Sequence, residues 1–159
     1  MDKTLLFEYL SIELKKNLEL AMNAAQATYD IATHEDNKAE NKYDTRGLEA
    51  SYLAGAQAQR VAEMMDVLLC FKSTALKNFH DGSTVAITAL VEVILNEKTN
   101  YLLIMPLGGG QTVKLLNQTI QVVTPISPLG KALIGQSAGE IITILAGGQK
   151  REYEIASIQ

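Results

Sequence analysis

The chain contains 159 residues, a length that suits one compact domain or two small ones and excludes a large multidomain enzyme. Apolar residues make up 47% and charged residues 20%, which excludes a disordered, collagen-like or supercharged chain. Lys and Arg total 14 against 18 Asp and Glu, so the net charge is −4. This balance argues against a protein held to nucleic acid by its own basic surface.

The single cysteine, Cys70, excludes an internal disulfide and a cysteine-rich zinc site, and it fits a reducing cytosol. The first apolar stretch is broken by Glu8 and Glu13, so no signal peptide is expected. No apolar run approaches the ~18 residues that cross a bilayer. We therefore expect a cytoplasmic protein that has no membrane partner.

Up to about residue 80 there is no proline, and helix-forming residues dominate. Apolar and small residues recur there at gaps of three and four, which predicts two amphipathic helices. The first stripe is Leu6, Leu10, Leu14, Leu18, Ala21, Ala25, Thr28 and Ala32. The second stripe is Leu48, Tyr52, Gly55, Ala58, Ala62, Met65 and Leu69.

A polar, charged break over residues 33–46 separates the two stripes, which predicts an antiparallel helical hairpin with a charged tip. Small residues are expected in the seam near that tip, where they would let the helices approach closely: Ala21, Ala25, Gly55 and Ala58. A fragment of a three- or four-helix bundle is the alternative that the periodicity leaves open.

The second half contains all three prolines and nine of the eleven glycines, together with runs rich in Val, Ile and Thr. It predicts a small antiparallel sheet with strands over residues 84–95, 101–107, 112–116, 119–123, 140–145 and 153–158. One short helix interrupts them, with Ser127 as N-cap, Pro128 at the first helical position and Gly135 after its end. The predicted class is α+β, with a hairpin domain over 1–78 and a β domain over 79–159.

No self-contained active site is visible. The run Gly108 to Gly110 lacks phosphate-loop spacing and is expected to be a turn between strands. His34 and His80 are far apart in the sequence and are expected on the surface, while Cys70 is expected to be a buried, inert thiol. No serine lies in a nucleophile-elbow motif.

The remaining candidate functional residues lie at the hairpin tip. Four acids lie within ten residues there and present hard oxygen ligands: Glu35, Asp36, Glu40 and Asp44. Lys38 and Lys42 oppose binding of a cation by the tip alone. A solvated loop is one interpretation, and the delivery of carboxylates to another molecule's magnesium site is the other.

Residues 124–135 read Thr-Pro-Ile-Ser-Pro-Leu-Gly-Lys-Ala-Leu-Ile-Gly, and Gly139, Glu140 and a closing Tyr-Glu-Ile at 153–155 follow. This pattern resembles the last domain of the bacterial Gre transcript-cleavage factors, the GreA/GreB family of transcription elongation factors. Residues 39–52 resemble a divergent, Gre-like subgroup. The resemblance covers nearly the whole chain and implies a coiled-coil hairpin, an FKBP-like C-terminal domain, and RNA polymerase as the partner, entered through its secondary channel.

The Gre tip reads Asp-x-x-Glu-Asn-x-x-Tyr, and its two acids hold the second magnesium ion of the polymerase. Here Asp36 and Tyr43 keep the family's separation, but Glu40 and Asn41 fall one position late. Ala39 therefore stands where the family has Glu. Either the loop still presents the shifted acids, or they are displaced and cleavage is weak or lost.

The resemblance implies roles for further residues. Asp36 and Glu40 would act as catalytic acids and Mg²⁺ ligands, only within the polymerase complex. The supporting tip residues would be Glu35 and Asp44 as substitute ligands, and Asn41 and Tyr43 as residues that position the loop or the RNA end. The turn Ile126, Ser127 and Pro128 would contact the polymerase at the channel rim.

The favoured reading is a monomeric transcription elongation factor that stimulates cleavage of backtracked RNA by the polymerase. It would be no enzyme itself, would have no intrinsic cofactor, would share Mg²⁺ with the polymerase, and would meet nascent RNA and DNA only indirectly.

The alternative is a secondary-channel regulator without cleavage activity. A peptidyl-prolyl isomerase is a weaker alternative, because such an enzyme lines its pocket with aromatic residues and residues 80–159 carry only Tyr101 and Tyr153. A coiled-coil adaptor would self-associate through the hairpin.

Overall fold

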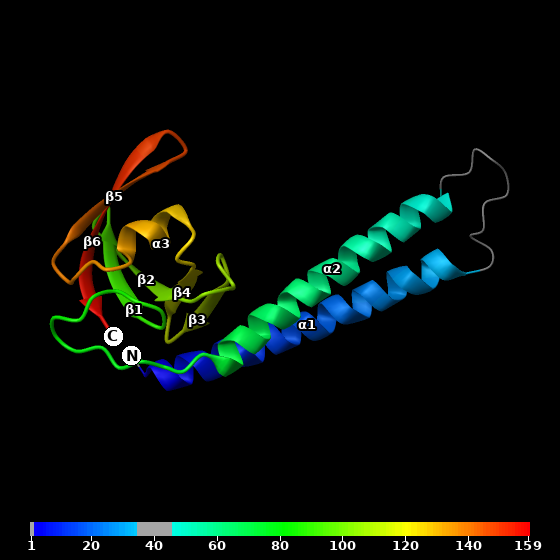
Figure 1. The fold of residues 1–159 in the computed structure, drawn as a ribbon, viewed down its shortest axis with the longest axis horizontal. Helices are drawn as coiled ribbons and strands as arrows, with labels where there is room; N and C mark the ends of the chain where they lie inside the picture. Colours follow the sequence, from blue (N-terminus) through cyan, green and yellow to red (C-terminus); the bar gives the residue numbers. More distant parts are fainter. Residues whose placement is uncertain (1, 35–45) are drawn as a thin grey trace. The chain divides into compact units, whose positions relative to one another are not determined.

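The computed structural model describes residues 2–34 and 46–159 (Figure 1). The chain divides by its contacts into two compact units, one of residues 11–69 and one of residues 1–10 together with 70–159. Each unit is described by itself below. The predicted domain boundary between residues 78 and 79 stays a prediction.

Two long helices, α1 (Lys3–Thr33) and α2 (Arg46–Ser73), run side by side in opposite directions (Figure 1), and most of their length forms the first unit. The carboxylate of Asp2 begins α1, because its Oδ1 accepts a hydrogen bond of 2.9 Å from the N–H of Thr4. The hairpin and the sheet that follows confirm the predicted α+β class. Neither helix is both long enough and apolar enough to span a membrane in the parts of the chain that the structure describes.

The predicted stripe on α1 is confirmed. Leu14 and Leu18 are buried, and small residues that are partly buried continue the same face toward the tip: Ala21, Ala25, Thr28 and Ala32. Every gap along this face is three or four residues, as one side of an α-helix requires.

The predicted stripe on α2 is wrong. Each of its members is exposed, including Tyr52 at 71% and Leu69 at 59%. A neighbouring stripe, one residue earlier along most of its length, is covered instead: Gly47, Ala50, Ala54, Gln57, Val61, Met64, Leu68 and Phe71. Gly55 and Ala58 therefore do not line the seam, and a Cβ added at Gly55 would meet nothing within 4 Å.

The physical reason is that α2 carries two adjacent stripes with similar apolar content. The covered stripe is the one that ends in Leu68 and Phe71, both buried, and the ring of Phe71 lies 5.7 Å from that of Phe7. Toward the tip this stripe presents Ala50 and Ala54, which match the small residues of α1. The larger side chains of the predicted stripe point outward.

The second unit contains a six-stranded sheet in the order β3-β4-β2-β1-β6-β5. Its strands are β1 (Leu90–Leu95), β2 (Lys98–Ile104), β3 (Thr112–Leu115), β4 (Gln118–Val123), β5 (Ile141–Ala146) and β6 (Gln149–Ile158). All neighbours pair antiparallel except β2 and β4, which are parallel. The predicted sheet was antiparallel throughout, so this parallel pair is a correction.

The strand boundaries also differ from the prediction at the start of the sheet. The first strand begins at Leu90 rather than at residue 84, and Thr84 makes only an isolated bridge to Ser137. Thr88 interrupts extended backbone there, because its φ is +72°. The last strand begins earlier than expected, at Gln149.

Three hairpins of the sheet turn through two residues with positive φ, which is the turn that fits the twist of antiparallel strands. The turns lie at Asn96 and Glu97, at Leu116 and Asn117, and at Gly147 and Gly148. Leu116 is unusual because a bulky side chain rarely adopts φ of +51°, and this side chain is 82% exposed.

One face of the sheet forms the core with the short helix α3 (Pro128–Leu133). Buried residues from five strands and from α3 meet there, among them Val91, Val93, Ile104, Ile155 and Leu133. Figure 1 shows α3 beside the strands of this unit. The core fixes the position of α3 and therefore of the turn that precedes it.

Candidate functional site

The turn before α3 has the geometry that the sequence predicts. Ser127 is the N-cap, and its Oγ accepts a hydrogen bond of 3.0 Å from the N–H of Gly130. The same hydroxyl donates to the carbonyl oxygen of Thr124 at 2.7 Å, so both sides of the turn are tied to one side chain. Pro128 occupies the first turn of α3, and Gly135 follows its end with φ of +83°.

Gly130 allows the backbone of this turn to close on itself. A Cβ at this position would lie 2.0 Å from the carbonyl oxygen of Thr124, so no other residue fits without a shift of the main chain. The turn is therefore built by the backbone, by one hydroxyl and by one glycine. Ile126 contributes nothing to that scaffold and is 79% exposed.

A groove of about 480 Å³ lies beside the turn. Its walls come from the end of β4, from the turn, from α3, from β5 and from the glycine-rich loop before β3, and they include Thr124, Pro128, Leu129, Ile144 and Leu145. Leu145 is 77% exposed. Contiguous apolar patches rimmed by polar residues mark interaction surfaces, so we take the turn and this groove as the candidate surface.

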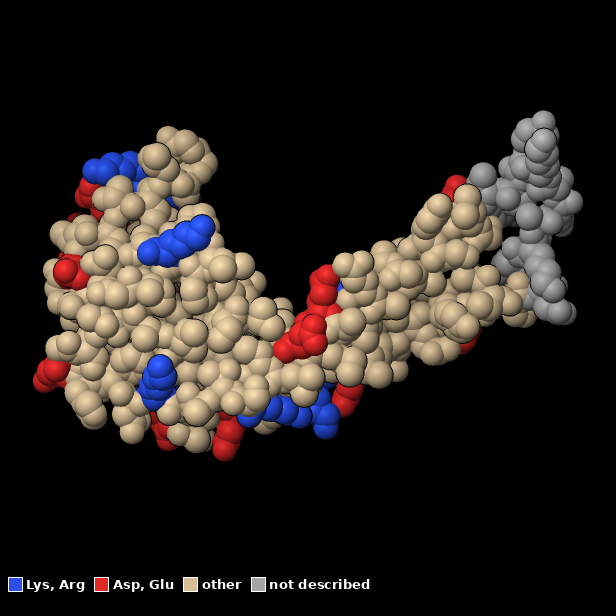
Figure 2. All heavy atoms as spheres, viewed as in Figure 1, with Lys and Arg blue, Asp and Glu red and all other residues tan. Residues whose placement is uncertain are grey.

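Charges of both signs lie near this surface. Lys150 and Glu152 pair at 2.7 Å near the β5–β6 turn, and the hydrogen bond and charge of Lys150 lower the pKa of Glu152. Figure 2 shows blue and red side chains scattered over the sheet unit on the face in view. The exposed apolar side chains make the turn and groove suited to contact with an apolar protein surface.

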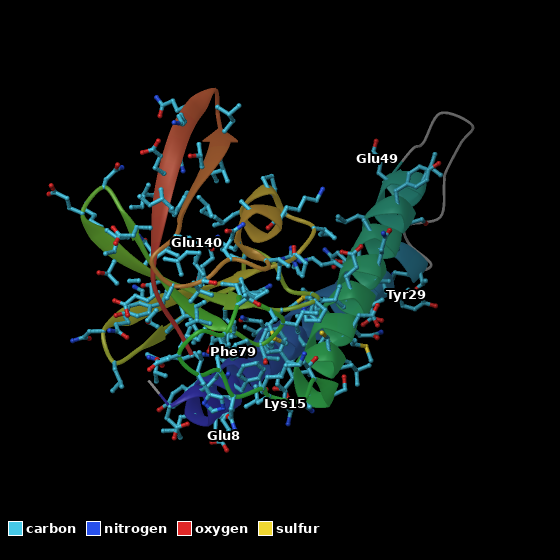
Figure 3. The ribbon with its side chains drawn as sticks, turned by 60° about the vertical axis from the view of Figure 1, so that its left-hand side comes forward. Glu8, Lys15, Tyr29, Glu49, Phe79 and Glu140 are labelled. Carbon is cyan, nitrogen blue, oxygen red and sulfur yellow. The ribbon has the colours of Figure 1, made fainter. Side chains whose placement is uncertain are left out.

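The tip residues singled out in the sequence lie outside the described residues: Glu35, Asp36, Glu40, Asn41, Tyr43 and Asp44. Their roles therefore stay predictions. The described chain leads up to them at Thr33, whose Oγ1 donates to the carbonyl of Tyr29 at 2.9 Å, and resumes at Arg46. Figure 3 shows Tyr29 near the end of α1 and Glu49 in the first turn of α2.

Within the described ranges, no three His, Cys, Asp or Glu side chains come together as metal ligands. His34 and His80 are both exposed. Cys70 is partly rather than fully buried, and its Sγ lies 3.7 Å from the Oγ1 of Thr74. These three residues are far apart in the sequence, and they form no group of metal ligands within the described chain.

Sequence reasoning missed the groove beside the turn. Ile144 and Leu145 belong to a strand that follows α3, and only the packing of that strand beside the turn brings them to one surface. One signal in the sequence could have indicated this surface. Side chains alternate along a strand, so if Ile142 faces the core, Leu145 points away from it and is left exposed.

These features define a two-part protein, a long helical hairpin joined to a sheet that presents one rigid, apolar turn. Residues 80–159 match the family model described as "Transcription elongation factor, GreA/GreB, C-term", which covers half of the chain. The chain belongs to the GreA/GreB family of transcription elongation factors.

Relatives of the chain extend over both parts. The protein named transcription inhibitor protein Gfh1 from Thermus thermophilus is 22% identical over 156 residues, covering 96% of this chain and 92% of the relative. The crystal structure of Gfh1 from the same species is 20% identical, with 94% of each chain covered and a TM-score of 0.38. The GreA/GreB factor of Nitrosomonas europaea is 14% identical, covers 70% of this chain and 91% of its own, and has a TM-score of 0.37.

Proposed function

We propose that this protein is a regulator of transcription that binds RNA polymerase and places its hairpin tip in the secondary channel. The observation that carries the proposal is the exposed Ile126 on a turn held by Ser127 and Gly130, inside the region that the family model covers. An apolar side chain on a rigid turn loses little conformational freedom on binding, which favours its use as a contact.

We further propose that this regulator binds the polymerase without stimulating RNA cleavage. Two observations support this choice. Ala39 stands at the position where the Gre tip has its magnesium-binding Glu. The relative that covers nearly the whole chain is named a transcription inhibitor. A tip that occupies the channel but lacks one carboxylate would block substrate entry and would not complete a two-metal site.

Stimulation of cleavage is the second candidate, and Asp36 and Glu40 favour it. Magnesium needs near-octahedral oxygen coordination and keeps several waters, so two carboxylates on a tip would bind it poorly alone. Beside an ion that the polymerase already holds, the same two groups would supply part of a second site. In this case the polymerase, and not this chain, would perform the hydrolysis.

One pair of measurements tests both candidates. Binding of the full chain to core RNA polymerase is measured by titration, and RNA shortening is followed in stalled, backtracked complexes. We expect binding, and no shortened transcripts above the rate of the polymerase alone. Shortened transcripts that disappear in the Asp36→Asn and Glu40→Gln variants would establish the second candidate instead, and absence of binding would contradict both.

A further inference from the structure

The sheet face opposite α3 carries a row of polar side chains across four adjacent strands. Glu92 in β1 is paired with Tyr101 in β2 on one side and with Ser157 in β6 on the other. Gln118 in β4 extends the row, because its Nε2 donates to the Tyr101 hydroxyl at 2.9 Å. Ser157 Oγ donates to Glu92 Oε2 at 3.2 Å.

A bulge in β6 creates this row. Val91 pairs with Ile158, Glu92 with Ser157, and Val93 with Ile155, so Ala156 is the additional residue. Simple alternation from the buried Ile155 would turn Ser157 into the core. The bulge instead turns Ser157 to the side of Glu92, and it returns Ile158 to the core side with Val91. Bulges commonly re-aim a side chain next to a functional site.

The row forms one side of a hollow of about 250 Å³. Its apolar walls are Leu90 and the exposed Leu116, which is the leucine held at positive φ. A strained, exposed leucine costs stability, and residues with such strain cluster at functional sites. The hollow is smaller than the ~300–1,000 Å³ of sites that enclose a whole drug-sized ligand, and it is suited to a single side chain or a small molecule.

The negative charge of Glu92 in the hollow favours a cationic ligand. Glu92 supplies the formal negative charge among the lining side chains, and it forms no ion pair with the described residues. Its Oε1 has no hydrogen-bond partner among those residues, while Oε2 holds Ser157. We propose that this hollow binds a guanidinium group on an aliphatic stem, with the carboxylate of Glu92 as its counter-ion.

A guanidinium fits this surface better than an ammonium. The acceptor oxygens of Glu92, Tyr101 and Ser157 lie on neighbouring strands about 4.8 Å apart, and a planar fork with five N–H donors can reach several of them at once. A guanidinium is also more weakly hydrated and packs on aromatic rings, which Tyr101 provides. Leu90 and Leu116 would contact the methylene stem. An arginine side chain of a protein and a free alkylguanidine share this chemistry.

The test is an NMR titration of the ¹⁵N-labelled full chain with n-butylguanidinium. We expect saturable shifts of the amides of Glu92, Tyr101 and Ser157. Glu92→Gln keeps the shape and removes the charge, and should weaken binding about tenfold or more. Glu97→Gln, at an exposed turn outside the hollow, is the matched control and should leave the affinity unchanged.

Two further comparisons complete the design. The peptide acetyl-Gly-Arg-Gly-amide presents the same group on a backbone: tighter binding than n-butylguanidinium assigns the hollow to a protein arginine, and weaker binding assigns it to a free small molecule. n-Butylammonium should bind more weakly than either. Tyr101→Phe should weaken binding about threefold, which keeps the test decisive if Glu92→Gln disturbs the sheet. Equal affinity of the parent and both variants, shifts centred elsewhere, or equal binding of n-butylammonium would overturn the proposal.

Discussion

The N–H of Lys77 donates a hydrogen bond of 3.0 Å to the hydroxyl oxygen of Thr88, a fully buried residue with φ of +72°. The N–H of Thr88 in turn donates to the carbonyl of Ile104 in β2 at 2.8 Å. Lys77 also accepts a hydrogen bond at its carbonyl from Lys3, whose amine lies 4.7 Å from the ring centre of Phe79. Burial lowers the pKa of Lys3. Thr88 thus ties the segment after α2 to the sheet.

Thr88→Val is expected to destabilise the protein by about 1–2 kcal/mol, because valine keeps the buried shape and removes the acceptor for the Lys77 N–H. Thr88→Ser keeps the hydroxyl and should cost less. Urea unfolding measures both. Thr84→Val, at an exposed position in the same segment, is the control. Equal stability of the Val and Ser variants would show that the hydrogen bond has no role.

Ile126→Asp combined with Pro128→Gly is expected to raise the Kd for RNA polymerase about tenfold or more, because the change removes an apolar contact and loosens the first turn of α3. The far-ultraviolet spectrum should remain nearly unchanged. Ile141→Asp tests a similarly exposed isoleucine outside the groove and should bind like the parent. Parental affinity of the double variant would show that the turn is not the contact.

Ala39→Glu restores the acid at the position that the Gre tip uses. We expect this single change to confer RNA shortening in stalled polymerase complexes and to leave binding unaltered, because a second carboxylate would complete the oxygen ligands beside the metal of the polymerase. Ala39→Gln has similar size and no charge, and should remain inactive. If both variants remain inactive while they still bind, the tip has a further defect besides the missing charge.

Gln57→Leu is expected to stabilise the hairpin by about 1 kcal/mol. Gln57 belongs to the covered stripe of α2, and its buried Oε1 has no hydrogen-bond partner among the described residues. An apolar side chain removes the cost of that unpaired oxygen. Gln59→Leu, at an exposed position that bonds Glu63, should change stability little. Thermal unfolding distinguishes them, and an equal gain in both variants would point to general helix propensity.

Leu116→Asn should stabilise the sheet unit by about 1 kcal/mol, because asparagine adopts positive φ more easily than leucine in a two-residue hairpin turn. The same variant should bind n-butylguanidinium more weakly, since it loses an apolar wall of the hollow. Leu107→Asn is the control at an exposed leucine that is not among the residues with positive φ. A variant that is neither more stable nor weaker in binding would contradict both interpretations of Leu116.

The sequence allowed prediction of features that depend on neighbouring residues. Ser127, Pro128 and Gly135 were recognisable as the start and end of α3, because cap preferences act within one turn of helix. The covered face of α1 was equally clear, since only one side of that helix has a continuous stripe of three- and four-residue gaps.

Features that depend on distant pairing could not be predicted. On α2 two stripes compete, and the burial of Leu68 and Phe71 decides between them. The parallel pairing of β2 with β4 and the bulge at Ala156 follow from how strands fit into the sheet, and no local residue preference encodes them. The polar row follows from those pairings, and the groove follows from the packing of β5 beside the turn.

The turn is held by the close approach of Gly130 to the carbonyl of Thr124, whereas the side chain that it exposes is that of Ile126. A mutation at Gly130 would be selected against through loss of folding, whereas position 126 can accept many side chains at little structural cost. Under the proposed function, the contact at position 126 is therefore free to change while the turn that carries it stays the same.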